Sequence, residues 1–107
     1  MIGVHCIKML PEDIEIFARR DVKISHNPVS NMYLGVGRAP IQEFQKAGLT
    51  ISLATDGAGS NNSQDMVEVL KCTALLHKVG LEDPGVIHSQ TILDMATIGG
   101  TKAIGQE

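Results

Sequence analysis

The stretch from Leu49 to Asn62, LTISLATDGAGSNN, decides the fold of this chain. Its first part alternates large apolar residues with small ones, which is the period of a β-strand with one strongly apolar face. The strand is expected to end at Asp56, the one carboxylate of the stretch, because the glycine, serine and asparagine residues that follow favour a loop before the next helix. The pattern therefore places a carboxylate at the C-terminal tip of a buried strand.

The position of Asp56 suggests chemistry but does not establish it. In α/β folds, ligands and catalytic groups collect at the C-terminal edge of the strands, because the loops there vary while the sheet fixes their positions. Asp-Gly is also a common turn dipeptide, so a turn aspartate without a chemical role is the alternative. The residues around Asp56 leave both interpretations open.

Composition limits the fold and the partners. A chain of 107 residues forms one domain at most, residues 1–107, and its 3% aromatic content predicts an aliphatic core. The net charge of −3 supplies no basic field, so we expect neither a nucleic acid nor a membrane partner. No apolar run approaches the roughly 20 residues of a membrane span, and the N-terminus does not resemble a signal peptide, so we expect a cytoplasmic protein. Cys6 and Cys72 are expected to be reduced and packed as small apolar groups.

The residues before the central stretch predict two more strands with helices between them. Met1 to Ile7 and Val22 to Ser25 are short apolar runs, and Leu10 to Arg20 has the proline, acidic start and basic end of a helix. Val29 to Arg38 is interpreted as a glycine-bearing loop, and Pro40 to Gly48 as a second helix.

The residues after the central stretch predict helices. Ser63 is expected to cap a helix that ends at Gly80, and Ser89 to cap another, which Gly99 and Gly100 interrupt before a short final segment, residues 102–104. Strands alternating with helices predict an α/β fold with parallel strands. Because three strands leave both edges of the sheet open, the pattern indicates one part of a larger barrel or sheet.

Chemistry-bearing residues lie at the ends of all three predicted strands: His5, His26 and Asp56. Imidazole and carboxylate together suit a divalent metal such as zinc, and they also suit proton transfer. His5 as a core histidine and His26 as a turn residue remain alternatives. The other two histidines, His77 and His88, have no acidic companions and are interpreted as structural or solvated.

Residues 4–66, from VHCIKMLPEDIEIFARRDVKISHNPVSN through TDGAGSNNSQDM, resemble the amidohydrolase superfamily. The nearest branch resembles the 5-methylthioadenosine/S-adenosylhomocysteine deaminases and related chlorohydrolase-type enzymes, and the motifs HNPVSN and TDGAGSNN are specific together. The resemblance implies a (β/α)8 TIM-type barrel with a metal at its C-terminal face and a small β-sandwich formed by the two ends of the chain. Met1 to Ile7, Val22 to His26 and Leu49 to Asp56 would be strands six, seven and eight.

The resemblance also implies roles for individual residues. Asp56 would ligate the metal, expected to be one Zn²⁺ per complete site, and would help to move the proton of the attacking water. Iron and manganese accept the same donors. His5 would hydrogen-bond that water. Residues expected to contact the substrate or to form the wall of its site are Ser60, His26, Ser30 and Asn31.

The chain also departs from the family pattern. The His-x-His pair after strand one, the histidine of strand five and the nearby glutamate have no counterpart here, so strands one to five and both halves of the sandwich are expected to be missing. Asp56 and His5 alone are too few ligands for zinc, which needs three protein groups even at a catalytic site. We therefore expect these residues to be the C-terminal part of a metal-dependent amidohydrolase barrel, inactive by themselves.

Two functions follow as hypotheses. The first is the hydrolytic deamination of an adenosine-type nucleoside or a related heterocycle, with a small nucleoside-like amine as the substrate. The second is a non-catalytic α/β half-barrel that self-associates or completes the barrel of a partner chain. Open strand edges predict self-association, as a homo-oligomer, in either case.

Overall fold

The computed structural model describes residues 1–61 and 64–105, except for the side chains of Ala58 and Ser60. Within these residues three strands, β1 (Ile2–Val4), β2 (Lys23–His26) and β3 (Ile51–Leu53), form one sheet in the order β1-β2-β3. Both pairs of strands are parallel, and Ile24 of β2 is in register with Gly3 on one side and Ile51 on the other. The predicted parallel α/β arrangement is confirmed.

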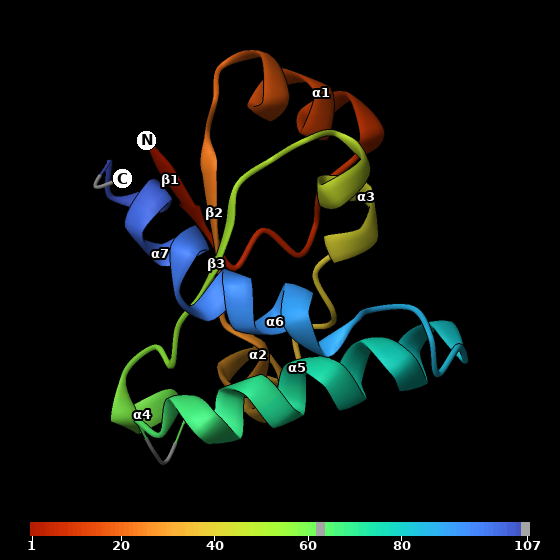
Figure 1. Cartoon of the computed structure of the whole chain (residues 1–107), viewed down its shortest axis with the longest axis vertical. Helices are drawn as coiled ribbons and strands as arrows, with labels where there is room; N and C mark the ends of the chain where they lie inside the picture. The colour runs from red at the N-terminus through yellow and green to blue at the C-terminus, as the bar shows by residue number, and fades with distance from the viewer. Residues whose placement is uncertain (62–63, 106–107) are drawn as a thin grey trace.

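Helices connect the strands and follow the last of them (Figure 1). Helix α1 (Pro11–Arg19) links β1 to β2, and α2 (Pro28–Leu34) and α3 (Ile41–Lys46) link β2 to β3. The helices after β3 are α4 (Ala58–Asn61), α5 (Met66–Leu81), α6 (Ser89–Ala96) and α7 (Ile98–Ala103). Helices α6 and α7 pack against β3, and α2 packs against α4 and α5.

The first and third strands are shorter than the sequence predicts. Strand β1 ends at Val4 instead of Ile7, because His5 and Cys6 have φ angles of +65° and +51° and leave the extended conformation. Strand β3 covers Ile51–Leu53, and residues 54–57 already belong to the loop. The candidate residues at these two strand ends, His5 and Asp56, therefore lie on turns that follow the strands.

The predicted loop from Val29 to Arg38 is wrong, because its first half is helix α2. Pro28 occupies the first helical position, where its fixed φ favours the helix and its missing N–H costs nothing. Gly35 ends the helix at a φ of +65°, with its N–H donating to the carbonyl of Met32 at 3.1 Å. The glycines shape the end of this segment, whereas Pro28 determines its start.

The helices after β3 also differ in their boundaries. Ser63, the predicted cap, lies outside the described residues, and Asp65 caps α5 by accepting a hydrogen bond from the N–H of Val67 at 2.9 Å. Ser89 is the first residue of α6 rather than its cap. Gly99 and Gly100 lie inside α7 and do not interrupt it, and a side chain at Gly99 would collide with the carbonyl of Ile51. Glycine here permits the close approach of α7 to β3.

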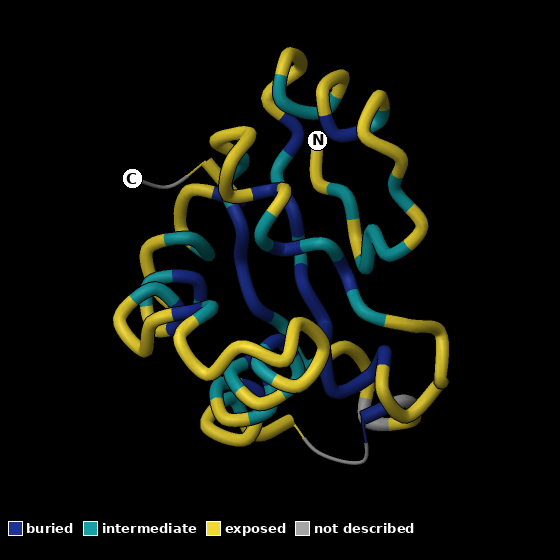
Figure 2. The backbone as a smooth tube through the Cα atoms, turned by 90° about the vertical axis from the view of Figure 1, so that its right-hand side faces the viewer, coloured by how far each residue is buried: buried dark blue, intermediate teal, exposed yellow. Residues whose placement is uncertain are grey.

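The core lies on one face of the sheet. Buried side chains from the strands and helices form it: Ile14, Ile24, Val29, Ala39, Ile41, Phe44, Ile51, Leu53, Val69, Ile87, Ile92 and Met95. In Figure 2 β3 is wholly buried and β2 is buried at alternate residues, whereas the N-terminal segment, residues 1–10, contains no buried residue. Ile2 and Val4 on β1 remain 42% and 54% exposed. The first strand therefore lies at an edge of the sheet and carries uncovered apolar side chains.

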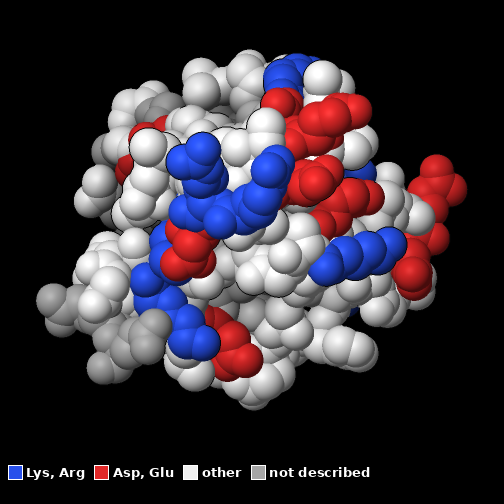
Figure 3. Space-filling model, turned by 90° about the horizontal axis from the view of Figure 1, so that it is seen from above, with Lys and Arg blue, Asp and Glu red and all other residues white. Residues whose placement is uncertain are grey.

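The surface carries charges of both signs. On the face shown in Figure 3, Lys and Arg side chains lie beside Asp and Glu side chains, so this face presents no uniform basic field. One such pair is Lys23 with Asp21, whose Nζ and Oδ2 atoms lie 2.7 Å apart. Among the helices that the structure describes, none has the length and apolar character needed to cross a membrane.

Candidate functional site

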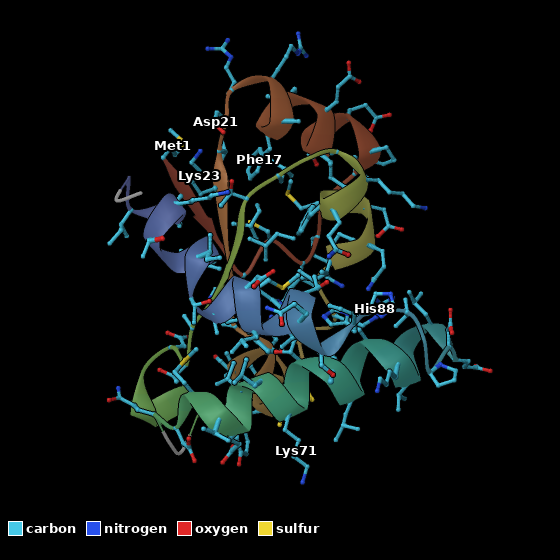
Figure 4. All side chains as sticks on the ribbon, viewed as in Figure 1. Met1, Phe17, Asp21, Lys23, Lys71 and His88 are labelled. Atoms are coloured by element: carbon cyan, nitrogen blue, oxygen red, sulfur yellow. The ribbon has the colours of Figure 1, made fainter. Side chains whose placement is uncertain are left out.

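The predicted site residues gather at the C-terminal edge of the sheet. His5 follows β1, His26 is the last residue of β2, and Asp56 lies three residues after β3. This edge faces α2 and α5, whereas Met1 and Lys23, labelled in Figure 4, mark the opposite edge. Parallel strands bring their C-terminal ends together, which is why His5 and Asp56, 51 positions apart in the sequence, meet here.

Asp56 is held in a fixed orientation at this edge. Its φ of +63° turns the chain sharply after β3. The N–H of Gly57 donates to Oδ1 at 2.9 Å, and the hydroxyl of Ser30 on α2 donates to Oδ2 at 2.9 Å. Two charge-assisted hydrogen bonds of this kind fix the orientation of a carboxylate. The side chain still keeps 35% of its surface exposed, so it is accessible.

Hydrogen bonds from Asn61 and Thr55 also hold the loop that carries Asp56. Asn61 on α4 donates from Nδ2 to the carbonyl of Thr55 at 2.6 Å, and the Thr55 hydroxyl donates to the carbonyl of Asp56 at 3.0 Å. Asn61 is 1% exposed, so water does not compete for this contact. The TDGAGSNN motif thus supplies both the carboxylate and part of the frame around it.

His5 lies directly beside Asp56. Its Nε2 is 3.4 Å from Asp56 Oδ2, and its Nδ1 is 2.8 Å from Oδ1 of Asn31 on α2. The N–H of His5 donates to the carbonyl of Ser25 at 3.0 Å, which ties the turn to β2. Of the residues that the sequence singled out, the structure brings His5, Ser30, Asn31 and Asp56 into one connected group.

His26 takes a different direction. Its ring is fully buried against His77 of α5, with the two Nε2 atoms 3.0 Å apart and the ring centroids 5.1 Å apart. Burial, followed by the neighbouring His77 and His5, lowers the pKa of His26 from the ordinary 6.5 to about 3. Burial and the Arg38 guanidinium lower the pKa of His77 to about 4. Both rings are therefore neutral near pH 7, and one Nε2–H donates to the other ring.

The pairing of His77 with His26 was not predicted. The sequence held a partial signal, because Val69, Thr73 and His77 recur every four residues and all three are buried on one face of α5. The role of His26 as a wall residue stays a prediction. The same holds for Ser60, whose side chain lies outside the described part of the chain.

Two side chains at this edge carry donor atoms of the kind that bind metal ions. Asp56 offers carboxylate oxygen and His5 offers imidazole nitrogen, and both are accessible. Across residues 1–61 and 64–105, no group of three or more His, Cys, Asp or Glu side chains is placed to hold a metal ion. Because zinc needs at least three protein ligands, the described residues do not hold it by themselves.

Comparison with known proteins identifies the family. The sequence profile described as "Amidohydrolase family" matches residues 1–107. This chain belongs to the amidohydrolase family. It is 43% identical over 107 residues to a 5'-deoxyadenosine deaminase of Methanosarcina acetivorans. It is 44% identical over 107 residues to a 5-methylthioadenosine/S-adenosylhomocysteine deaminase of Desulforudis audaxviator. Each match covers 100% of this chain and 25% of the relative, so the amidohydrolase chain spans about a quarter of the length of these proteins.

Solved structures show the same partial coverage. An adenosine deaminase from Xanthomonas campestris with bound zinc superimposes with a TM-score of 0.91 at 35% identity, over 97% of this chain and 24% of that one. A zinc complex of atrazine chlorohydrolase from Arthrobacter aurescens superimposes with a TM-score of 0.93 at 30% identity, over 98% and 24% of the two chains. The predicted partial (β/α)8 barrel is confirmed.

Proposed function

We propose that this chain supplies the C-terminal part of the active site of a hydrolytic deaminase for an adenosine-type nucleoside. The observation that carries the proposal is the pairing of His5 with Asp56, 3.4 Å apart and both accessible, at the C-terminal edge of an amidohydrolase sheet. In such a reaction water adds to the ring carbon, the amino group leaves as ammonia, and an oxo group replaces it. The activities named for the relatives support this class of substrate.

The residues of this chain would bind and orient groups in that reaction. Asp56, fixed by Ser30 and Gly57, is the residue that would hold a divalent metal, and zinc is the first candidate because two similar structures contain it. A zinc ion, when bound, supplies Lewis acidity. Nε2 of His5 lies 3.4 Å from Oδ2 of Asp56 and would hold or release a proton next to that carboxylate. Ser60 of α4 is proposed to contact the substrate.

A graft of this chain into a relative tests the proposal, because the relative supplies the part of the barrel that this chain does not provide. Residues 1–107 would replace the matching quarter of the Methanosarcina acetivorans 5'-deoxyadenosine deaminase, and ammonia release from 5'-deoxyadenosine would be measured with zinc present. The parent enzyme is the positive control, and the parent without that quarter is the negative control. We expect the graft to turn over substrate well above the negative control. A folded graft that binds zinc but releases no ammonia would contradict the proposal.

A second candidate function is a non-catalytic half-barrel that self-associates or completes a partner's barrel. The observation in its favour is the uncovered apolar edge of β1, where Ile2 and Val4 remain 42% and 54% exposed. Light scattering of the 107-residue chain over a concentration series tests it. Concentration-dependent association supports self-association, whereas a monodisperse monomer at every concentration rejects it.

A further inference from the structure

We propose that Asn31 is a positioning residue that holds His5 as the Nδ1–H tautomer, so that the Nε2 lone pair faces Asp56. The consequence for catalysis rests on the proposed function, whereas the tautomer itself does not. This role differs from the predicted one, in which Asn31 contacts the substrate as part of the wall.

The contact distances decide which ring nitrogen of His5 carries the hydrogen. Nδ1 lies 2.8 Å from Asn31 Oδ1, the length of a good hydrogen bond, whereas Nε2 lies 3.4 Å from Asp56 Oδ2. Two bare acceptors at 2.8 Å would repel each other, so Nδ1 donates to the amide oxygen. Asn27 Nδ2 lies 3.4 Å from the same Nδ1 and is too distant to compete as a donor.

The surroundings of Asn31 keep water away from its amide oxygen. Asn31 is fully buried, its backbone carbonyl accepts the N–H of Val36 at 3.2 Å just beyond α2, and its side-chain Nδ2 has no hydrogen-bond partner among the described residues. A buried hydrogen bond is stronger than an exposed one because water does not compete for its partners. The ring of His5 is therefore fixed at Nδ1, while 36% of its side-chain surface remains exposed.

In this arrangement a neighbouring side chain, Asn31, orients the base, His5. The hydrogen bond made by one ring nitrogen determines whether the other nitrogen carries a hydrogen. While Nδ1 donates to Asn31, Nε2 of His5 keeps its lone pair on the side of Asp56. Because Asn31 has no exposed surface, it acts through His5 rather than on a substrate. Ser30, the preceding residue of α2, fixes Asp56 in the same way, so one short helix orients both partners.

The ring-nitrogen NMR spectrum of His5 tests the tautomer directly. The 107-residue chain, labelled with ¹⁵N-histidine, would be studied without substrate or metal in alkaline solution, and His5 would be assigned from the signal lost in His5→Gln. We expect Nδ1 to show the shift of a protonated nitrogen and Nε2 that of a bare one. The opposite pattern, or fast exchange between the two tautomers, overturns the inference.

Variants in the grafted deaminase test the consequence. Asn31→Leu removes the acceptor and is expected to lower kcat about 10–100-fold with KM nearly unchanged, as for other residues that orient a ligand or base. Asn31→Asp keeps an acceptor for Nδ1–H and should restore most of kcat. Gln42→Leu is the matched control, because it removes a half-buried amide of α3 whose polar side-chain atoms have no partner among the described residues.

The NMR experiment and the kinetic experiment distinguish a failure of the positioning role from a failure of the proposed function. A rise in KM without loss of kcat in Asn31→Leu would mean that Asn31 contacts the substrate, and the positioning role would be rejected. An inactive graft with the expected spectrum of His5 would reject the proposed function and leave the tautomer assignment in place. If Asn31→Leu does not fold, the spectrum of the unsubstituted chain and the Asn31→Asp variant still decide the question.

Discussion

The buried pair of His26 and His77 predicts a loss of stability in mildly acidic solution. Both rings are neutral in the folded chain because burial lowers the pKa values to about 3 and 4. Unfolding restores the ordinary value of about 6.5. The unfolded chain therefore binds more protons between these values, and stability that is full above pH 6.5 is lost as the pH falls toward 4.

The expected size follows from the difference in proton binding. At about pH 5 each unfolded ring, with a pKa of about 6.5, is protonated, whereas the folded ring is not. The gap of roughly 1.5 units between that pKa and the pH corresponds to about 2 kcal/mol of unfolding free energy per histidine. The two rings together give at most about 4 kcal/mol, a large share of the roughly 5–15 kcal/mol that stabilises a domain. The groups nearest to the pair, His5 and Arg38, add positive charge and act in the same direction.

Urea unfolding followed by circular dichroism at about pH 8 and pH 5 measures the effect. We expect the unsubstituted chain to lose about 2–4 kcal/mol between these conditions, and His77→Gln to lose about 2 kcal/mol less than that. His88→Gln is the matched control, because His88 is exposed in the connection before α6 (Figure 4). Equal pH dependence of the unsubstituted chain and His77→Gln would refute the reasoning.

Three further substitutions test the packing and the edge of the fold. Asp65→Ala removes the cap of α5 and should cost about 1 kcal/mol of unfolding free energy in urea, with no change if the cap is unimportant. Gly99→Ala should cost about 1–3 kcal/mol, because the added methyl group meets the carbonyl of Ile51, whereas Gly100→Ala, which meets open space, should not destabilise the chain. Val4→Lys places a charge on the open strand and should reduce concentration-dependent light scattering; unchanged scattering would assign self-association to another surface.

The sequence predicted the sheet because its signals are local. Apolar runs at residues 1–7, 22–25 and 49–56 identified all three strands, and their alternation with helices predicted that the strands are parallel. The tip of the last strand identified Asp56. The exact ends were missed where the backbone turns through positive φ, at His5 and Cys6, since the residue types there do not require such a turn. Helix α2 was missed because two glycines near its end outweighed the start signal of Pro28.

The contacts within the site could be predicted only in part. The meeting of His5 with Asp56 follows from parallel strands, because their C-terminal ends share an edge. The contacts of Ser30 and Asn31 depend on the helical turn that directs them toward these two residues, and the contact of His26 with His77 depends on how α5 crosses the sheet. Such placements arise from packing between elements distant in the sequence, which periodicity does not describe.

The central claim is that this chain provides Asp56 to a deaminase site. The most direct test is the kcat/KM of the grafted deaminase on 5'-deoxyadenosine, measured with and without Asp56→Asn, a substitution that keeps the size and removes the charge. The account predicts a loss of about 10³-fold or more, as for other residues that act in the reaction, with the fold unchanged by circular dichroism. A loss smaller than about tenfold would contradict it.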